Sequence, residues 1–132
     1  MLYYSGVLFL IGFLRQQIGR RRLLVPMYHR VRGPKESRET ALLDVQRGVP
    51  INLFEQHVRV FRWFGRLLPL HEAFDQMRDP TKPSRSVIAL TFDDGYCDNV
   101  KLAVPVLQRL QVQATFFPVV RTACGGRPLW WD

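Results

Sequence analysis

The segment SVIALTFDDG, residues 86–95, is the clearest indication of the fold class of this chain. It starts as a nearly continuous apolar run and ends in two adjacent carboxylates, Asp93 and Asp94, followed by Gly95. An apolar run of this kind is typical of a strand that is covered on both faces of a parallel sheet. The stretch therefore predicts a buried strand over residues 86–92 with an acidic pair directly after it.

The residues after the acidic pair argue against a simple hairpin. A hairpin turn at Asp94 and Gly95 would be followed at once by an alternating strand. Residues 98–110 instead carry apolar side chains at helical spacing, with Pro105 expected to kink or delay the helix, and residues 113–120 indicate another strand. This order predicts a βαβ unit with a parallel sheet and places the acidic pair on a loop at the carboxyl end of a strand, where α/β proteins hold their sites.

The chain before this unit predicts further short elements. Residues 23–31 indicate a short strand that contains Pro26, and the polar residues 32–50 indicate a loop. Residues 66–70 indicate a very short strand, and residues 71–77 one or two helical turns before a linking loop at 79–86.

Residues 52–65 predict the longest helix of this part of the chain. Asn52 is the expected N-cap, with Glu55 completing a capping box, and Gly65 is the expected end. Its apolar residues recur at helical spacing and predict a stripe facing the core. The stripe comprises Phe54, Val58, Phe61 and either Trp63 or Phe64.

The positive charge of the chain is concentrated at its N-terminus. The 132 residues carry a net charge of +8, of which +7 belongs to residues 1–35, a segment without any acidic residue. The apolar residues 2–14 come directly before this basic stretch and are too few for the roughly 20 residues of a spanning helix. Residues 1–22 therefore predict a helix at a membrane surface, with its basic end on anionic head groups; a helix packed on the protein's own core is the alternative.

The 132 residues are enough for one domain, and residues 23–132 are the part expected to belong to it. The charge distribution does not favour nucleic acid as a partner, because no nucleic-acid-binding motif accompanies it. The expected localisation is membrane-associated. Cys97 and Cys124 allow at most one disulfide, and no Cys/His spacing resembles a structural zinc site.

Two adjacent carboxylates at a strand end suit metal-assisted hydrolysis. Neighbouring residues leaving a strand point in different directions, so one carboxylate can hold a metal while the other takes a proton from water. Two ionised carboxylates at close range also favour a bound cation, for which zinc is the first expectation. The triplet Asp93-Asp94-Gly95 is a weak signal without partners.

Three segments together resemble the polysaccharide deacetylases, the NodB-homology or carbohydrate esterase family 4 group. LTFDDGYCDN (90–99) resembles the first motif of that family, PMYHRV (26–31) the first strand of one of its branches, and VQATFF (112–117) the strand after the first motif's helix. PLWWD (128–132) is similar to that branch as well. The resemblance covers the N-terminal part of the family domain. It implies an incomplete (β/α) barrel, truncated here after the strand that follows the first motif and preceded by the N-terminal apolar helix.

The resemblance also implies roles for the residues of the acidic motif. Asp93 would be the general base and Asp94 a ligand of a divalent metal, zinc by expectation. His29 would lie near the site as an acid or as a residue that orients the substrate, whereas the sequence alone favours a buried core histidine at this position. The reaction would remove N-acetyl, or sometimes O-acetyl, groups from a polysaccharide or sugar chain.

Four further residues of the motif are expected to support the site. Thr91 and Gly95 would shape the loop, and Tyr96 and Asn99 would line or brace it. His57 and His71 are interpreted as structural or surface residues, because their separation does not suit a metal-binding pair.

The family's second motif, a His-x-x-x-His pair of metal ligands, is missing from these 132 residues. The sequence therefore predicts poor zinc binding and little or no deacetylase activity for this chain alone. It is expected to be a fragment, or to need a second chain that supplies the histidines. A membrane-associated carbohydrate-binding or scaffolding module without catalysis is the alternative function.

Overall fold

The computed structural model describes residues 22–33, 48–81 and 86–120. The helix expected over residues 1–22 lies almost wholly outside the described residues, as do most of the loop expected at 32–50 and the segment 128–132. Among the described residues, no helix is long and apolar enough to cross a membrane.

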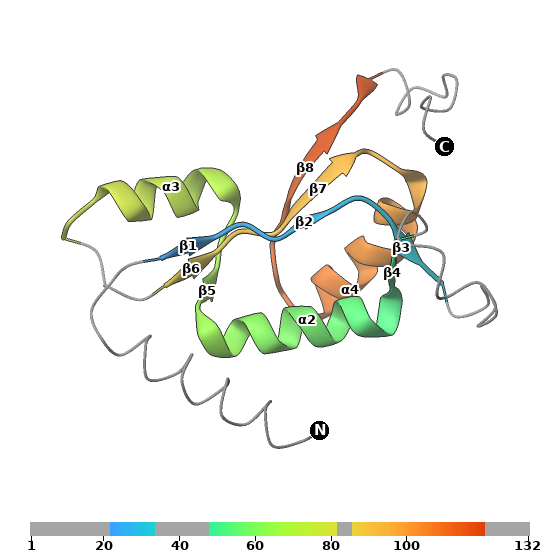
Figure 1. The fold of residues 1–132 in the computed structure, drawn as a ribbon, viewed down its shortest axis with the longest axis horizontal. Helices are drawn as coiled ribbons and strands as arrows, with labels where there is room; N and C mark the ends of the chain where they lie inside the picture. Colours follow the sequence, from blue (N-terminus) through green and yellow to red (C-terminus); the bar gives the residue numbers. More distant parts are fainter. Residues whose placement is uncertain (1–21, 34–47, 82–85, 121–132) are drawn as a thin grey trace.

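The apolar run of residues 86–95 lies at the centre of the sheet (Figure 1). It forms β6 (Val87–Ile88) and β7 (Thr91–Asp94), and β1 (Leu23–Leu24) and β2 (Met27–Tyr28) lie parallel beside β6 and β7. The Ala89 N–H donates to the Leu24 carbonyl, so pairing continues between the short strands, which form one ladder. The strand predicted over residues 23–31 is thus interrupted rather than continuous.

Pro26 is the physical reason for the interruption in that strand. It has no N–H to donate to a ladder, although its carbonyl accepts from the Thr91 N–H at 3.0 Å. The chain therefore stays beside β7 through Pro26 without regular pairing at every residue. It then bends away to form β3 (Val31–Arg32), which pairs with β4 (Val49–Pro50).

The other side of the central segment is occupied by β5 (Arg66–Leu67) against β6 and β8 (Thr115–Pro118) against β7. All the strand pairs are parallel, so the predicted βαβ unit and mixed α/β class are confirmed. Both strands are shorter than the predicted ranges of residues 66–70 and 113–120, because regular pairing with β6 and β7 is limited to Arg66–Leu67 and Thr115–Pro118.

Helices cover both faces of the sheet, as the apolar run requires. In Figure 1, α2 (Ile51–Phe64) and α4 (Val104–Arg109) lie on one side, and α3 (Leu70–Arg78) lies on the other. The central residues alternate between two cores. Val87 and Ala89 pack with Ala73 of α3, whereas the larger cluster on the other face contains Ile88, Leu90, Phe92, Phe54, Val58, Val106 and Leu107.

Helix α2 starts at a different residue from the one predicted. It begins at Ile51 after Pro50, without a side-chain cap, so the predicted capping box of Asn52 and Glu55 is wrong. Glu55 instead accepts a hydrogen bond from Arg59 on Oε1 and one from Arg109 on Oε2. The stripe is confirmed in Phe54 and Val58, and Phe64 rather than Trp63 joins it; Trp63 is 67% exposed.

The predicted helix end at Gly65 is confirmed, but the reason is crowding rather than a left-handed cap. A Cβ at Gly65 would lie 2.7 Å from the Ser86 carbonyl oxygen. The glycine thus lets the end of α2 approach the residue before β6.

The helix predicted over residues 98–110 has two parts. Asn99–Ala103 form a π-helical segment, η3, and α4 follows directly. Pro105 lies at the start of α4, where its missing N–H and its ring disturb the preceding turn. The wider π turn accommodates the proline without ending the helix, which agrees with the expected kink or delay.

Candidate active site

The acidic pair belongs to the strand itself. Asp93 and Asp94 are the last residues of β7, so the prediction that they lie on a loop after the strand is wrong. The strand extends because Asp93 and Asp94 pair with Phe117 and Pro118 of β8. Both acids are half-buried and remain at the carboxyl edge of the sheet.

The backbone turns sharply at the end of this strand. Asp94 has φ 66° and Gly95 φ 74°, both left-handed. Aspartate tolerates this region better than most residues, and glycine tolerates it without strain. A Cβ at Gly95 would lie 2.7 Å from Cβ of Pro118, so a side chain does not fit there. Gly95 therefore allows β7 and β8 to stay close where the acidic pair ends the strand.

Strand alternation assigns the Asp93 position to one face of the sheet. Val87 and Ala89 face α3, and Asp93 follows on the same face with the same two-residue period. Ala89 and Asp93 are separated by four residues, or roughly 13 Å along a strand. Asp93 thus lies beyond the part of this face that Ala73 of α3 covers.

The register of β2 and β7 brings His29 to the same edge of the sheet as the acidic pair. Tyr28 ends β2 and is the Cα partner of Phe92; His29 follows Tyr28 directly, as Asp93 follows Phe92 on β7. His29 is exposed. The interpretation of His29 as a buried core histidine is therefore wrong, and its imidazole is available to a ligand at this edge.

Thr91 fixes β2 on β7 just before the acidic pair. Its side chain is buried, and its Oγ1 donates to the Pro26 carbonyl at 3.3 Å, beside the backbone bond from the Thr91 N–H. The Pro26 carbonyl thus accepts two bonds from Thr91, one on each lone pair.

Tyr96 and Asn99 follow the acidic pair and have different surroundings. The Tyr96 ring is half-buried and lies under the Arg30 guanidinium, 4.8 Å from ring centroid to Cζ. Asn99 is buried at the start of η3, where its N–H donates to the Tyr96 carbonyl at 3.0 Å. Within the part of the chain that the structure describes, Asn99 Oδ1 and Nδ2 have no hydrogen-bond partner.

Arg30 and Asp98 also lie at this edge, and the sequence analysis did not single them out. Arg30 Nε donates to Asp98 Oδ2 at 3.0 Å, and the Val31 N–H donates to Asp98 Oδ1 at 3.3 Å. Both residues lie inside the quoted motifs 26–31 and 90–99, and their opposite charges are the signal that could have found them.

An aromatic cluster supports the edge from the α2 side of the sheet. Tyr28 lies 5.4 Å from Phe92 between ring centroids, Phe92 lies 4.8 Å from Phe116, and Phe54 packs on Tyr28 at 5.1 Å. Burial raises the pKa of Tyr28 to about 12, and its hydroxyl lies 3.1 Å from His57 Nδ1. The interpretation of His57 as structural agrees with this contact.

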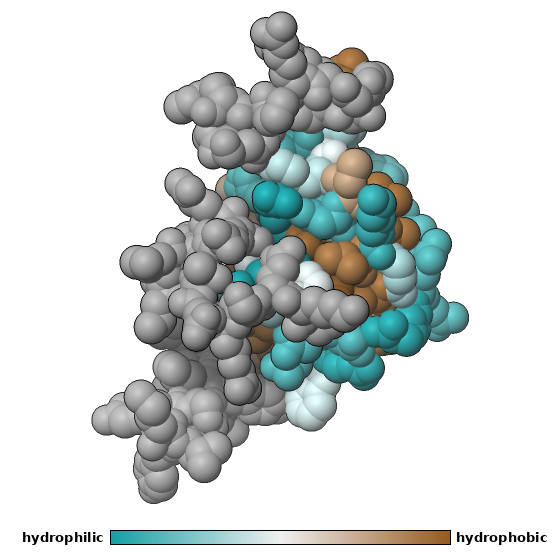
Figure 2. Space-filling model, turned by 90° about the vertical axis from the view of Figure 1, so that its right-hand side faces the viewer, coloured by the Kyte–Doolittle hydropathy of each residue, from teal (hydrophilic) through white to brown (hydrophobic). Residues whose placement is uncertain are grey.

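The surface beside the acidic pair is partly apolar. Exposed hydrophobic residues there are Met27, Phe117, Val119 and Val120. Figure 2 views the molecule from the side toward which β7 and β8 end and shows hydrophobic residues at the surface among hydrophilic ones.

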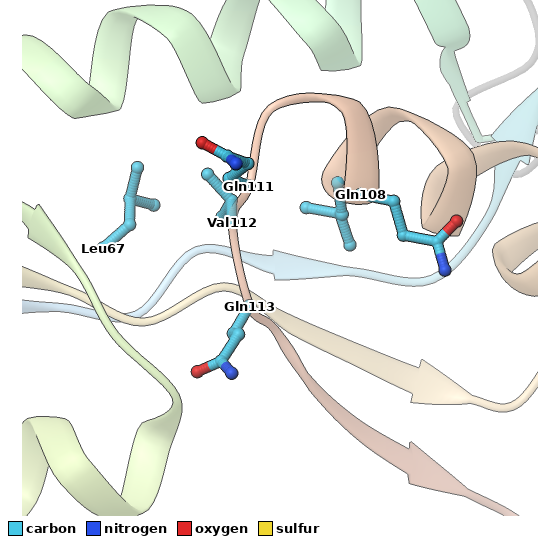
Figure 3. A pocket seen from close by; sticks show the side chains of 6 residues that line it. Leu67, Gln108, Gln111, Val112 and Gln113 are labelled. Carbon is cyan, nitrogen blue, oxygen red and sulfur yellow. The ribbon is translucent and has the colours of Figure 1, made fainter.

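A separate hollow of about 420 Å³ lies at the other end of β8 (Figure 3). It is lined by Leu67, Leu107, Gln108, Gln111, Val112 and Gln113. The labelled side chains of Gln111 and Gln113 point to opposite sides of the chain in Figure 3. The lining holds no carboxylate, imidazole or thiol, so this hollow is not the site of the chemistry.

The described residues do not form a complete metal centre. Among residues 22–33, 48–81 and 86–120, no group of three His, Cys, Asp or Glu side chains could hold a metal ion. The whole sequence contains three histidines, of which His57 is bonded to Tyr28 and His71 is exposed on α3 beside Glu72. A catalytic zinc needs three protein ligands, so these residues alone do not fit one.

Comparison with known proteins gives a consistent result. The polysaccharide deacetylase family model matches residues 81–126. The "Putative polysaccharide deacetylase YxkH" of Bacillus subtilis (strain 168) is 32% identical over 99 residues, which are 74% of this chain and 32% of that protein. The chain thus spans about a third of the length of this curated relative.

Solved structures share the fold over a similar part of their length. IcaB from Ammonifex degensii matches with a TM-score of 0.61 and 26% identity, covering 77% of this chain and 40% of IcaB. A de-N-acetylase from Aggregatibacter actinomycetemcomitans matches with a TM-score of 0.58 and 27% identity, covering 74% and 37%. The Streptococcus pyogenes deacetylase PplD, in complex with acetate, is 24% identical and shows the fold alone, with a TM-score of 0.65 over 81% and 46%. In sequence and in fold, this chain is therefore similar to polysaccharide deacetylases over part of their length.

Proposed function

We propose that this chain forms the N-terminal part of a metal-dependent deacetylase that removes N-acetyl groups from a polysaccharide or sugar chain. The observation that carries the proposal is the parallel pairing of β2, which ends just before His29, with β7, which ends in Asp93 and Asp94 at the same edge of the sheet. Edges of this kind hold the sites of α/β proteins. The similar deacetylases support the reaction class, and the barrel would be completed by residues outside the described ranges or by a second chain.

Asp93 is the proposed general base. As a half-buried carboxylate at the strand end, it can accept the proton of a water that attacks the acetyl carbonyl carbon. His29, exposed at the same edge of the sheet, is proposed to give a proton to the departing amine or to orient the sugar.

Asp94 is the proposed metal ligand. Asp93 and Asp94 are successive residues of β7, and successive side chains of a strand point in different directions, so the two carboxylates can take separate roles. A divalent cation, zinc by preference, supplies Lewis acidity to an amide hydrolysis when bound. Asp94 can provide only one donor of the set, because the described residues do not complete it.

Residues 1–22 are proposed to bring the enzyme to a membrane surface. The support is the apolar segment 2–14 and the arginines that follow it, Arg15 and Arg20–Arg22, which suit anionic head groups. Co-flotation with anionic liposomes compares residues 1–132 with residues 23–132. Equal partitioning of the two would contradict this part of the proposal.

The catalytic assignment is tested with the polypeptide isolated from its native host, using acetate release from an N-acetylglucosamine oligomer. Asp93→Asn and Asp94→Asn should each lower turnover by at least about 100-fold, the scale of a lost general base. Only Asp94→Asn should also weaken zinc binding in equilibrium dialysis. His71→Gln, on the exposed face of α3, is the matched control and should change neither quantity.

Three results would contradict parts of the proposal. Zinc retention by Asp94→Asn equal to that of the parent would remove the ligand role. Residues 1–132 produced alone should release little acetate with added zinc, because the described residues do not form a complete donor set; clear release would show that these 132 residues suffice. Glycan binding without any acetate release by the parent polypeptide would favour a binding module.

A further inference from the structure

The segment that carries His29 is held in place by contacts from two other elements. Its backbone is fixed on one side by β4, because the Val49 N–H donates to the Arg30 carbonyl at 2.9 Å. On the other side lies Asp98, which follows the acidic motif and precedes η3. His29 thus lies between Tyr28, anchored in the aromatic cluster, and Arg30, anchored by β4 and Asp98.

Asp98 makes two bonds to this segment through different oxygens. Oδ2 accepts from Arg30 Nε at 3.0 Å, and Oδ1 accepts from the Val31 N–H at 3.3 Å. The Asp98 side chain is 17% exposed, so solvent screens the ion pair only in part. The same carboxylate therefore fixes both the side chain and the backbone of the residues after His29.

The Arg30 guanidinium has a second neighbour on the same loop. It lies over the Tyr96 ring, with Cζ 4.8 Å from the ring centroid, a distance typical of a cation–π contact. Tyr96 and Asp98 both follow Gly95, and the Asn99 N–H donates to the Tyr96 carbonyl. The loop after the acidic pair is thereby connected to the segment after His29 by a charge pair, a backbone bond and a ring contact.

We propose that Asp98 is a positioning residue that sets the His29 imidazole against the Asp93 carboxylate. The proposal rests on the proposed function for the meaning of that geometry. The strand register brings His29 and Asp93 to the same edge of the sheet, but an exposed side chain after a strand end needs a fixed backbone to hold its direction. Asp98 supplies this restraint from the segment that follows the acidic pair.

The experiment uses the polypeptide isolated from its native host with Asp98→Ala, Asp98→Asn and Arg30→Ala. Asp98→Asn keeps an oxygen for the Val31 N–H but loses the charge that pairs with Arg30. The matched control is Glu55→Gln, which removes the charge of a carboxylate on the α2 surface. That carboxylate is bonded to Arg59 at 2.7 Å and to Arg109 at 2.6 Å. Acetate release from an N-acetylglucosamine oligomer gives kcat and KM, and thermal unfolding gives Tm.

Asp98→Ala should lower kcat by about 10- to 100-fold, the scale of a misplaced catalytic group, with little change in KM. Asp98→Asn should fall between Asp98→Ala and the parent, and Arg30→Ala should resemble Asp98→Asn. Glu55→Gln should leave kcat unchanged. An equal fall of kcat in Glu55→Gln, or an unchanged kcat in Asp98→Ala, would overturn the proposal.

A second readout does not depend on the reaction. In histidine-labelled protein, the His29 ring signal, identified through His29→Gln, should shift in Asp98→Ala and stay in place in Glu55→Gln. An unmoved His29 signal in Asp98→Ala overturns the positioning role whatever the activity. A shifted signal in a parent polypeptide that releases no acetate supports the restraint on His29 and refutes the proposed function instead.

Discussion

Substitution of Gly95 by alanine tests whether the end of β7 is as tightly constrained as the structure indicates. Gly95 has φ 74°, and an added Cβ would lie 2.7 Å from Cβ and 2.9 Å from Cα of Pro118. These are atoms of the β8 backbone and of a proline ring, which cannot rotate away. The new methyl group must therefore push β8 from β7 or change the φ angle of Gly95.

The expected destabilisation has two parts. A left-handed conformation costs an alanine about 1–2 kcal/mol more than glycine. Overpacking against a fixed neighbour adds about 1–3 kcal/mol. The free energy of unfolding should thus fall by about 2–5 kcal/mol, a large part of the 5–15 kcal/mol typical of a domain.

Urea unfolding measures the effect of Gly95→Ala, and Gly33→Ala is its control. No atom lies within 4 Å of a Cβ at Gly33, and no left-handed φ restricts that position. Gly33→Ala should stay within about 0.5 kcal/mol of the parent, whereas Gly95→Ala should lower the urea midpoint by about 1–2 M. Equal midpoints for the two variants would refute the reasoning about the contact with Pro118.

Three further predictions concern the core and the site edge. Phe92→Ala should lower the free energy of unfolding by about 3–5 kcal/mol, because it removes a fully buried ring from the aromatic cluster; a loss below about 1 kcal/mol in urea unfolding would contradict this packing. Gly48→Ala should destabilise more than Gly33→Ala, because its φ is 87° and its Cβ would meet the Arg30 carbonyl; equal urea midpoints would contradict that contact. The pKa of Tyr28 is about 12 in the folded state and about 10 in the unfolded state. The free energy of unfolding is therefore unaffected by Tyr28 below pH 10 and falls as the pH rises to 12, because the unfolded state loses the proton first. Unfolding measured across this range should show a loss of about 2–3 kcal/mol that is absent in Tyr28→Phe, and identical pH profiles would contradict the burial effect.

The parts of the fold that the sequence predicted correctly follow from local patterns. Apolar periodicity marks β6 and β7, the stripe of α2 and the strand–helix–strand order, because burial on one or two faces imposes a regular spacing of apolar residues. The acidic pair stood out because charges directly after a buried strand need a reason. The predicted capping box was wrong because Glu55 had other possible partners: its carboxylate binds Arg59 and Arg109 instead of the N-terminus of α2.

The amino-acid sequence was sufficient to predict the mixed α/β class, the acidic pair at a strand end and the resemblance to the deacetylases. The exposure of His29 and the bonds of Asp98 to Arg30 and the Val31 N–H became known from the three-dimensional structure. His29 reaches the edge of the acidic pair through the register of β2 on β7, and Arg30 and Asp98 are 68 positions apart. Local patterns report which face of an element is buried, whereas contacts between distant segments depend on how those elements pack, and packing is settled by the whole chain at once.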